Sequence, residues 1–121
     1  MVSAIESENK NEILLKNNGL NLKYLVSQLP GTCLSKISVY KLTFQLIKRL
    51  KTLHSLGFVH NNIKPSNILI GVEDHREIYL IDFGESHSYQ TENGAHIEPS
   101  QLGQFKGNFK FASFNACSFR I

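Results

Sequence analysis

Two short segments of this 121-residue chain carry the side chains that could do chemistry. Residues 60–67 read His-Asn-Asn-Ile-Lys-Pro-Ser-Asn, and residues 82–84 read Asp-Phe-Gly. Together they supply amides, a lysine, a histidine and a carboxylate. Between them, the apolar runs 68–70 and 78–81 flank the polar stretch 71–77, a pattern typical of a β-hairpin. The two motifs therefore bracket a predicted hairpin.

A helix is expected before the first motif. Ser38 is predicted to be its N-cap, and Gly57 is suited to end it because glycine readily adopts a left-handed conformation. Apolar residues recur between them at helical spacing and should face a core: Val39, Leu42, Leu46, Ile47, Leu50 and Leu53. Lys48, Arg49 and Lys51 lie off this stripe and should face water, although they could instead contact an acidic partner.

Shorter elements complete the pattern. Residues 13–15 form a short apolar run that could be a buried strand, and residues 22–29 predict a short helix that ends at Pro30-Gly31. Residues 84–106 are polar and predict a long loop. Long loops in compact domains are usually functional or disordered.

The order of helix, His-x-x-Ile-Lys-Pro-x-Asn, hairpin, Asp-Phe-Gly and loop resembles the catalytic half of a protein kinase. Residues 107–115 read Gly-Asn-Phe-Lys-Phe-Ala-Ser-Phe-Asn and resemble the Gly-Thr-Ala-Arg-Tyr-Ala-Ser-Ile-Asn stretch of casein kinase I. That family carries Ser-Ile-Asn where most kinases have Ala-Pro-Glu. Residues 14–25 resemble its hinge, with Gly19 matching the hinge glycine.

The resemblance covers about residues 13–115 and implies an α+β fold. We expect a partial protein-kinase-like C-terminal lobe, mainly helical, with a short β-hairpin and a long activation-type loop. Residues 1–12 would be a polar N-terminal segment and residues 116–121 a C-terminal tail. The resemblance also implies ATP and magnesium as cofactors, and an acidic or phosphorylated protein as the substrate.

The resemblance implies that three residues bind the ATP phosphates or the magnesium ions beside them. Asp82 would hold a magnesium ion that bridges the ATP phosphates, and Asn67 would hold a second one through its amide oxygen. Magnesium prefers such hard oxygen ligands. Lys64 would reach the transferred phosphate as a point charge. Outside a kinase, residues 64–67 would be an ordinary polar turn and Asp82 a strand-end cap.

Other residues take roles at the adenine and at the substrate. Backbone groups from Lys16 to Asn18 would bond the adenine edge, and Leu69 and Ile81 would form an apolar floor under the ring. Lys110 stands where casein kinase I has an arginine that helps to bind acidic or phosphorylated substrates. Lysine keeps the charge but loses the fork geometry of arginine.

The sequence departs from the family at residues that matter for transfer. Asn62 stands where kinases have the aspartate that accepts the proton of the substrate hydroxyl, and an amide cannot act as that base. Asn61 replaces an arginine that in many kinases binds a phosphorylated activation loop. The glycine-rich loop and the Val-Ala-x-Lys strand do not precede the hinge. We therefore expect a degenerate, pseudokinase-like fragment with little phosphotransfer.

Two other hypotheses stay open. The chain could belong to a working kinase whose remaining segments lie outside this sequence. Alternatively, it could be a non-catalytic binding module that docks to a kinase partner or an acidic protein, through Lys110 and the basic face of the helix at residues 38–57.

Composition limits the remaining classes. With 41% hydrophobic and 19% charged residues the chain is globular, and a net charge of +3 does not argue for nucleic acid. No apolar run is long enough to cross a membrane, and the N-terminus lacks the order of a secretory signal. The distant Cys33 and Cys117 suggest a reducing compartment, so a cytoplasmic or nuclear location is expected. The histidines show no metal-binding spacing, and His60 is expected to be packed.

Overall fold

The computed structural model describes residues 19–97, 105 and 107–117. In chain order its helices are α1 (Leu22–Ser27), α2 (Lys36–Ser55) and α3 (Phe114–Cys117), and its strands are β1 (Phe58–Val59), β2 (Ile68–Ile70), β3 (Ile78–Leu80) and β4 (His87–Ser88). Single 3₁₀ turns occupy Pro30–Thr32, Pro65–Asn67 and Phe109–Phe111. The strand expected at residues 13–15 lies outside the described residues.

The long helix α2 begins earlier than predicted. Ser35, not Ser38, is its N-cap, because the Ser35 hydroxyl accepts a 3.1 Å hydrogen bond from the Ser38 N–H. The prediction for Ser38 was wrong because both serines suit a cap and nothing between them interrupts the helix. At the other end Gly57 has a φ of 81°, as expected for the residue that ends a helix.

Two apolar stripes run along α2, and they differ in exposure. The leucines of the predicted stripe are half-buried: Leu42, Leu46, Leu50 and Leu53. The predictions for Val39 and Ile47 were wrong, since their side chains are 47% and 59% exposed. Ile47 belongs to a second stripe at helical spacing, and all of its members are exposed: Ile37, Tyr40, Phe44 and Ile47.

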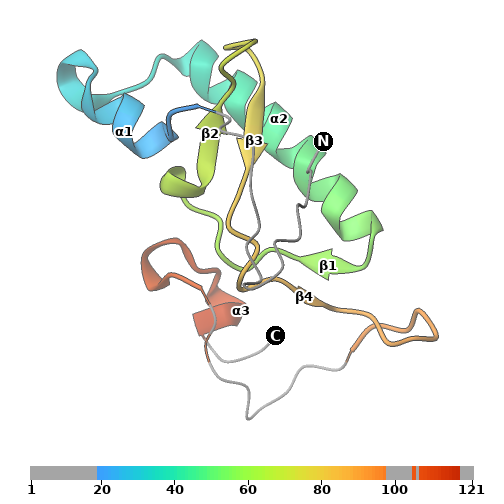
Figure 1. Cartoon of the computed structure of the whole chain (residues 1–121). Coiled ribbons are helices and arrows are strands. Elements are labelled where there is room, and N and C mark those ends of the chain that lie inside the picture. The colour runs from blue at the N-terminus through green and yellow to red at the C-terminus, as the bar shows by residue number, and fades with distance from the viewer. Residues whose placement is uncertain (1–18, 98–104, 106, 118–121) are drawn as a thin grey trace, which may run out of the picture.

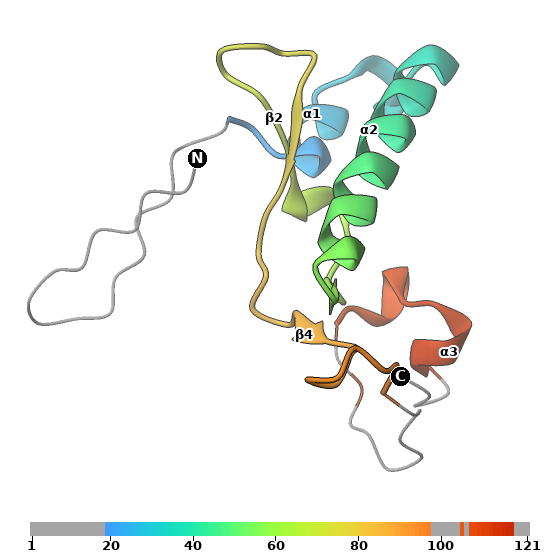
Figure 2. The same cartoon turned by 90° about the vertical axis from the view of Figure 1, so that its right-hand side faces the viewer.

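The predicted hairpin is present and contains the most buried apolar side chains. β2 pairs antiparallel with β3, with Leu69 opposite Tyr79. Ile68 and Ile78, on the other face, are only 7% and 2% exposed. The hairpin contacts α1 through β2 and α2 through β3 (Figure 1). After a quarter turn, the view shows α2 running alongside the hairpin (Figure 2).

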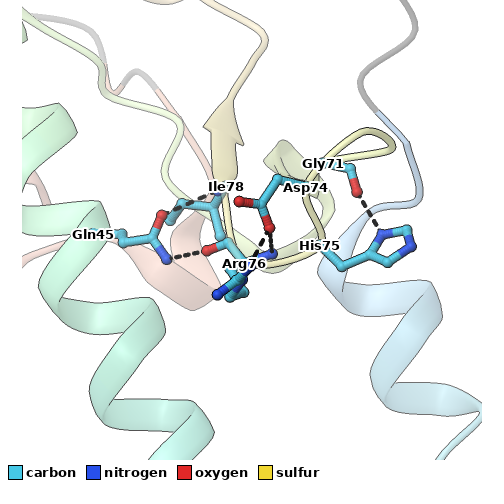
Figure 3. A network of polar contacts seen from close by, with 6 residues as sticks. All are labelled: Gln45, Gly71, Asp74, His75, Arg76 and Ile78. Carbon is cyan, nitrogen blue, oxygen red and sulfur yellow. Dashed lines mark hydrogen bonds and ion pairs between the residues drawn. The ribbon is translucent and has the colours of Figure 1, made fainter.

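Two side chains of α2 fix the helix to the hairpin. Gln45 Nε2 donates to the Arg76 carbonyl at 2.6 Å, and Gln45 Oε1 accepts from the Ile78 N–H at 3.2 Å (Figure 3). Arg49 forms a 2.6 Å ion pair with Glu77. Arg49 is exposed, as expected, and its long side chain also reaches the acidic turn of the hairpin.

The polar stretch after Asp-Phe-Gly contains more structure than predicted. β4 pairs antiparallel with β1, with His87 opposite Val59, and a bridge between Gln90 and His96 closes a turn. The prediction of one long loop was wrong here, because such short polar pairs show no apolar alternation in the sequence. β4 lies near the C-terminal end of α2 (Figure 1).

Among the described helices, none is long and apolar enough to cross a membrane.

Candidate functional site

The hairpin brings the two sequence motifs together at its open end. The pairing of β2 with β3 continues for one more residue, since the Ile81 N–H donates a 3.0 Å hydrogen bond to the Asn67 carbonyl. Asn67 directly precedes β2 and Asp82 directly follows Ile81. Asn67 Nδ2 therefore lies only 3.1 Å from Asp82 Oδ2, although the two residues are fifteen apart in the sequence.

Asn62 completes a polar cluster with Asn67 and Asp82. Its Nδ2 donates a 2.8 Å hydrogen bond to Asp82 Oδ2, and its backbone carbonyl accepts a 2.8 Å bond from Asn67 Nδ2. The two asparagines are buried, and Asp82 is exposed. Two amide donors thus converge on one carboxylate oxygen, and hydrogen bonds to a charged acceptor are the stronger kind.

His60 joins the two motifs from the buried side, with only 1% of its surface exposed. Its Nδ1 accepts a 3.2 Å hydrogen bond from the Asn62 N–H, so Nε2 carries the ring proton and donates to the Ile81 carbonyl at 3.1 Å. Burial lowers the pKa of His60, against the opposing effects of that carbonyl and of the Asp82 charge. His60 is therefore a packed, neutral histidine, as expected.

Asn61 ties the first motif to the chain beyond Asp-Phe-Gly. Its Nδ2 donates to the Glu85 carbonyl at 3.0 Å and to His87 Nδ1 at 2.7 Å. Asn61 and Asp82 have φ values of 61° and 67°, a left-handed conformation that is uncommon outside glycine and is often found at functional sites. No sequence pattern predicted the contacts of Asn61 with Glu85 and His87, because Asn61 was interpreted only as the residue that replaces an arginine.

Gly107 brings the C-terminal part of the chain against the same loop. It has a φ of 106°, and a Cβ placed on it would lie 2.1 Å from the Asn61 carbonyl oxygen, so only glycine fits. Three residues on, the Lys110 N–H donates to Asn108 Oδ1 at 3.0 Å. Lys110 is exposed, with Nζ 5.8 Å from the centre of the Phe111 ring. Lys110, the predicted contact for an acidic or phosphorylated substrate, thus belongs to the segment that Gly107 holds against the loop around Asn61.

Four other residues were predicted to contact the adenine, and Lys64 the transferred phosphate. Strand alternation puts Leu69 and Ile81 together on the face of the hairpin opposite Ile68 and Ile78. Lys64 is half-buried, and its carbonyl accepts a 2.9 Å hydrogen bond from the Asn67 N–H. The hinge contacts predicted for Lys16 and Asn18 lie outside the described residues.

Comparisons with known proteins agree with this arrangement. The family model described as "Protein kinase domain" matches residues 3–112. The chain belongs to the protein kinase family. It is 32% identical over 105 residues to a putative casein kinase I of Caenorhabditis elegans, and the match covers 85% of this chain and 31% of that protein. It is also 32% identical over 107 residues to a probable serine/threonine-protein kinase of Dictyostelium discoideum, over 77% of this chain and 22% of that protein.

A solved kinase structure shows the same fold. The structure of vaccinia related kinase 3 matches with a TM-score of 0.78 and 25% identity, over 88% of this chain and 32% of that one. The prediction of a partial kinase-like α+β fold is confirmed. The chain spans about a third or less of the length of the kinases it matches.

Kinases use ATP with magnesium, and the polar cluster fits a magnesium ion. Among the described residues, the side-chain hydrogen bonds of Asn67 use Nδ2 and those of Asp82 use Oδ2, so the Oδ1 atoms of both have no partner there. Both are the hard oxygen ligands that magnesium prefers. No group of three or more His, Cys, Asp or Glu side chains gathers within residues 19–97, 105 and 107–117. Phosphate oxygens and water would complete the coordination shell, as is usual for magnesium.

Proposed function

We propose that the chain is the metal- and nucleotide-binding part of a casein-kinase-I type serine/threonine kinase domain with impaired phosphotransfer. One observation carries this proposal: Asn67 lies against Asp82, each with an Oδ1 that takes part in no hydrogen bond among the described residues, while Asn62, at the position of the base, donates a hydrogen bond to Asp82 Oδ2. An amide engaged as a donor cannot take the proton of a substrate hydroxyl. General-base catalysis is worth about 10²–10⁴-fold, and we expect that factor to be missing.

The residues of the cluster would bind and orient rather than react. When bound, magnesium neutralises the charge of the ATP phosphates. Asp82 and Asn67 would hold it through their Oδ1 atoms, and Lys64 would add a positive charge at the transferred phosphate. No described carboxylate forms an ion pair with Lys64, so its charge is not neutralised within that part of the chain. Leu69 and Ile81 would exclude water beneath the adenine.

The casein-kinase-I type rests on the Caenorhabditis elegans relative and on the Ser-Phe-Asn triplet at residues 113–115. The corresponding substrate would be an acidic or phosphorylated protein, with the exposed Lys110 as a point-charge contact. The corresponding location is the cytoplasm or nucleus, where the exposed Cys33 and Cys117 would stay reduced.

The test is a phosphotransfer assay with Mg·ATP and an acidic peptide, beside a nucleotide-binding measurement on the same sample. We expect binding, with turnover at least about a hundredfold below the roughly 1–100 s⁻¹ of ordinary kinases. Turnover in that ordinary range would contradict the role assigned to Asn62. A folded chain that does not bind nucleotide would refute the proposal and favour the binding module, in which Lys110, Lys48 and Lys51 contact a kinase partner or an acidic protein.

A further inference from the structure

A second surface, separate from the polar cluster, has the features of a binding site. α1, α2 and the β2–β3 hairpin enclose a groove with a volume of about 460 Å³, within the range of about 300–1,000 Å³ that is usual for ligand pockets. We call it the α1–α2 groove. It shares no residue with the cluster of Asn62, Asn67 and Asp82. Most of its wall is apolar and is formed by Leu22, Leu25, Leu34, Leu42, Ile70 and Ile78.

Hydrogen bonds fix one wall of the groove. The two bonds from Gln45 to the Arg76 carbonyl and the Ile78 N–H hold the hairpin at a set distance from α2 (Figure 3). On the same turn His75 Nδ1 lies 2.8 Å from the Gly71 carbonyl, which holds the His75 ring in place. Hydrogen bonds within the chain thus hold this wall in place, and a site held in this way loses less conformational freedom when it binds.

The rim of the groove is positively charged, because Lys41 and Arg76 line it and none of the residues that line it is acidic. Arg76 contacts Asp74 at 3.3 Å, but these side chains are 91% and 51% exposed, and such pairs are weak. Glu73, Asp74 and Glu77 lie in the same hairpin turn as His75 and Arg76, where Asp74 contacts Arg76 and Glu77 pairs with Arg49. Among the residues that line the groove the charge is positive, and this favours a partner of the opposite sign.

We propose that the α1–α2 groove binds a peptide segment of a partner protein that combines leucine-like side chains with flanking carboxylates. The apolar side chains fill the groove, and the carboxylates meet Lys41 and Arg76. The positive rim disfavours lysine-rich segments, and it disfavours a second copy of the same surface, because two such rims repel each other. An apolar groove that takes side chains at regular spacing, with charges beside it, is a common mode of peptide recognition.

The test is fluorescence anisotropy with two labelled synthetic peptides, one of leucines interspersed with glutamates and one with lysine in place of each glutamate. The glutamate peptide should bind the chain at least about tenfold more tightly. The double variant Lys41→Glu/Arg76→Glu should weaken its binding by at least about tenfold. Lys51→Glu, a charge reversal on α2 outside the groove, should change it less than about twofold.

The apolar wall is tested with two exposed aromatic residues of α2. Phe44 lines the groove and is 61% exposed, whereas Tyr40 does not line it and is 77% exposed. Because both side chains are largely exposed, neither alanine variant should unfold the chain. Phe44→Ala should weaken binding of the glutamate peptide by at least about threefold, and Tyr40→Ala should leave it unchanged.

Several results would overturn the proposal: equal binding of the two peptides, no binding of either, or equal losses in Lys51→Glu and the double variant. A dimer that Phe44→Ala abolishes would also overturn it, with a second copy as the occupant. The assay contains no nucleotide and measures no phosphotransfer. Its failure therefore leaves the proposed nucleotide site untouched, and failure of that site leaves the groove untouched.

Discussion

The side-chain amide of Asn62 donates a 2.8 Å hydrogen bond to Oδ2 of Asp82. An aspartate at position 62 would place a second negative charge beside Asp82 instead of a donor. The amide therefore holds the carboxylate of Asp82 in position without a metal, and the same amide cannot act as a base. The contact that orders the cluster is also the reason that we expect slow phosphotransfer.

We expect Asn62→Asp to destabilise the metal-free chain by about 1.5 kcal/mol, because a hydrogen bond to a charged group is lost and two like charges meet. Magnesium should restore part of this loss. Urea unfolding in EDTA and in magnesium measures both effects. Asn93→Asp adds the same charge to an exposed turn and should change the free energy of unfolding by less than about 0.5 kcal/mol. Equal losses in the two variants would contradict the account.

Stability should fall as the pH drops below about 6.5, the ordinary pKa of histidine. Burial lowers the pKa of His60 in the folded chain, so the unfolded chain binds the proton first. The stabilising effect of the neutral ring is complete above pH 6.5 and is lost as the pH falls toward the folded pKa, by at most about 1.4 kcal/mol per pH unit.

Urea unfolding at several pH values, with an NMR titration of the His60 ring, measures this effect. The exposed His96 serves as the control, and His96→Gln should leave the fall in stability unchanged. A folded-state pKa of His60 at or above 6.5 would show that burial does not control its protonation.

Gly107→Ala should loosen the contact between the C-terminal turn and the loop around Asn61. The new Cβ would lie 2.1 Å from the Asn61 carbonyl oxygen, and Gly107 has a φ of 106°. We expect a loss of about 1–3 kcal/mol and faster amide exchange around residue 107. Gly94→Ala is the matched control, because Gly94 also has a positive φ, of 76°, but nothing lies within 4 Å of its added Cβ. If the two variants lose the same stability, backbone strain alone matters and the contact does not.

Gln45→Ala should release the hairpin from α2. It removes the partners of the Arg76 carbonyl and of the Ile78 N–H, which is part-buried, and an unsatisfied buried donor costs about 1–3 kcal/mol. Hydrogen exchange at Ile78, with urea unfolding, reports the change. Gln28→Ala removes an exposed glutamine of the α1 end and should cost less than about 0.5 kcal/mol. Unchanged exchange at Ile78 would show that packing alone holds the hairpin.

The elements that could be predicted from the sequence are those with a local signal. The hairpin follows from its two apolar runs, and the end of α2 from Gly57. The start of α2 was misplaced because Ser35 and Ser38 are equally good caps locally. Val39 and Ile47 were assigned to the core because spacing alone does not show which of two apolar stripes has a partner.

The site could be predicted by residue type but not by contact. Asn67 and Asp82 follow from the motifs, and the register of the hairpin explains why they meet. The bond of Asn61 to Glu85 and the approach of Gly107 to Asn61 join residues 24 and 46 positions apart, and no local pattern announces such contacts. The ion pair of Arg49 with Glu77 was missed for the same reason.

The most direct test of the central claim, that Asn67 and Asp82 form a metal-dependent nucleotide site, is the melting temperature of the chain with ATP, with magnesium and with both. A ligand that binds only the folded state raises stability by mass action, by about 2.7 kcal/mol at a hundred times its Kd. We predict a rise that requires both components, is lost in Asp82→Asn, and is kept in Asp74→Asn, which makes the same change in the exposed hairpin turn. A cooperative melt without a magnesium-dependent rise, or a rise that survives Asp82→Asn, would contradict the account.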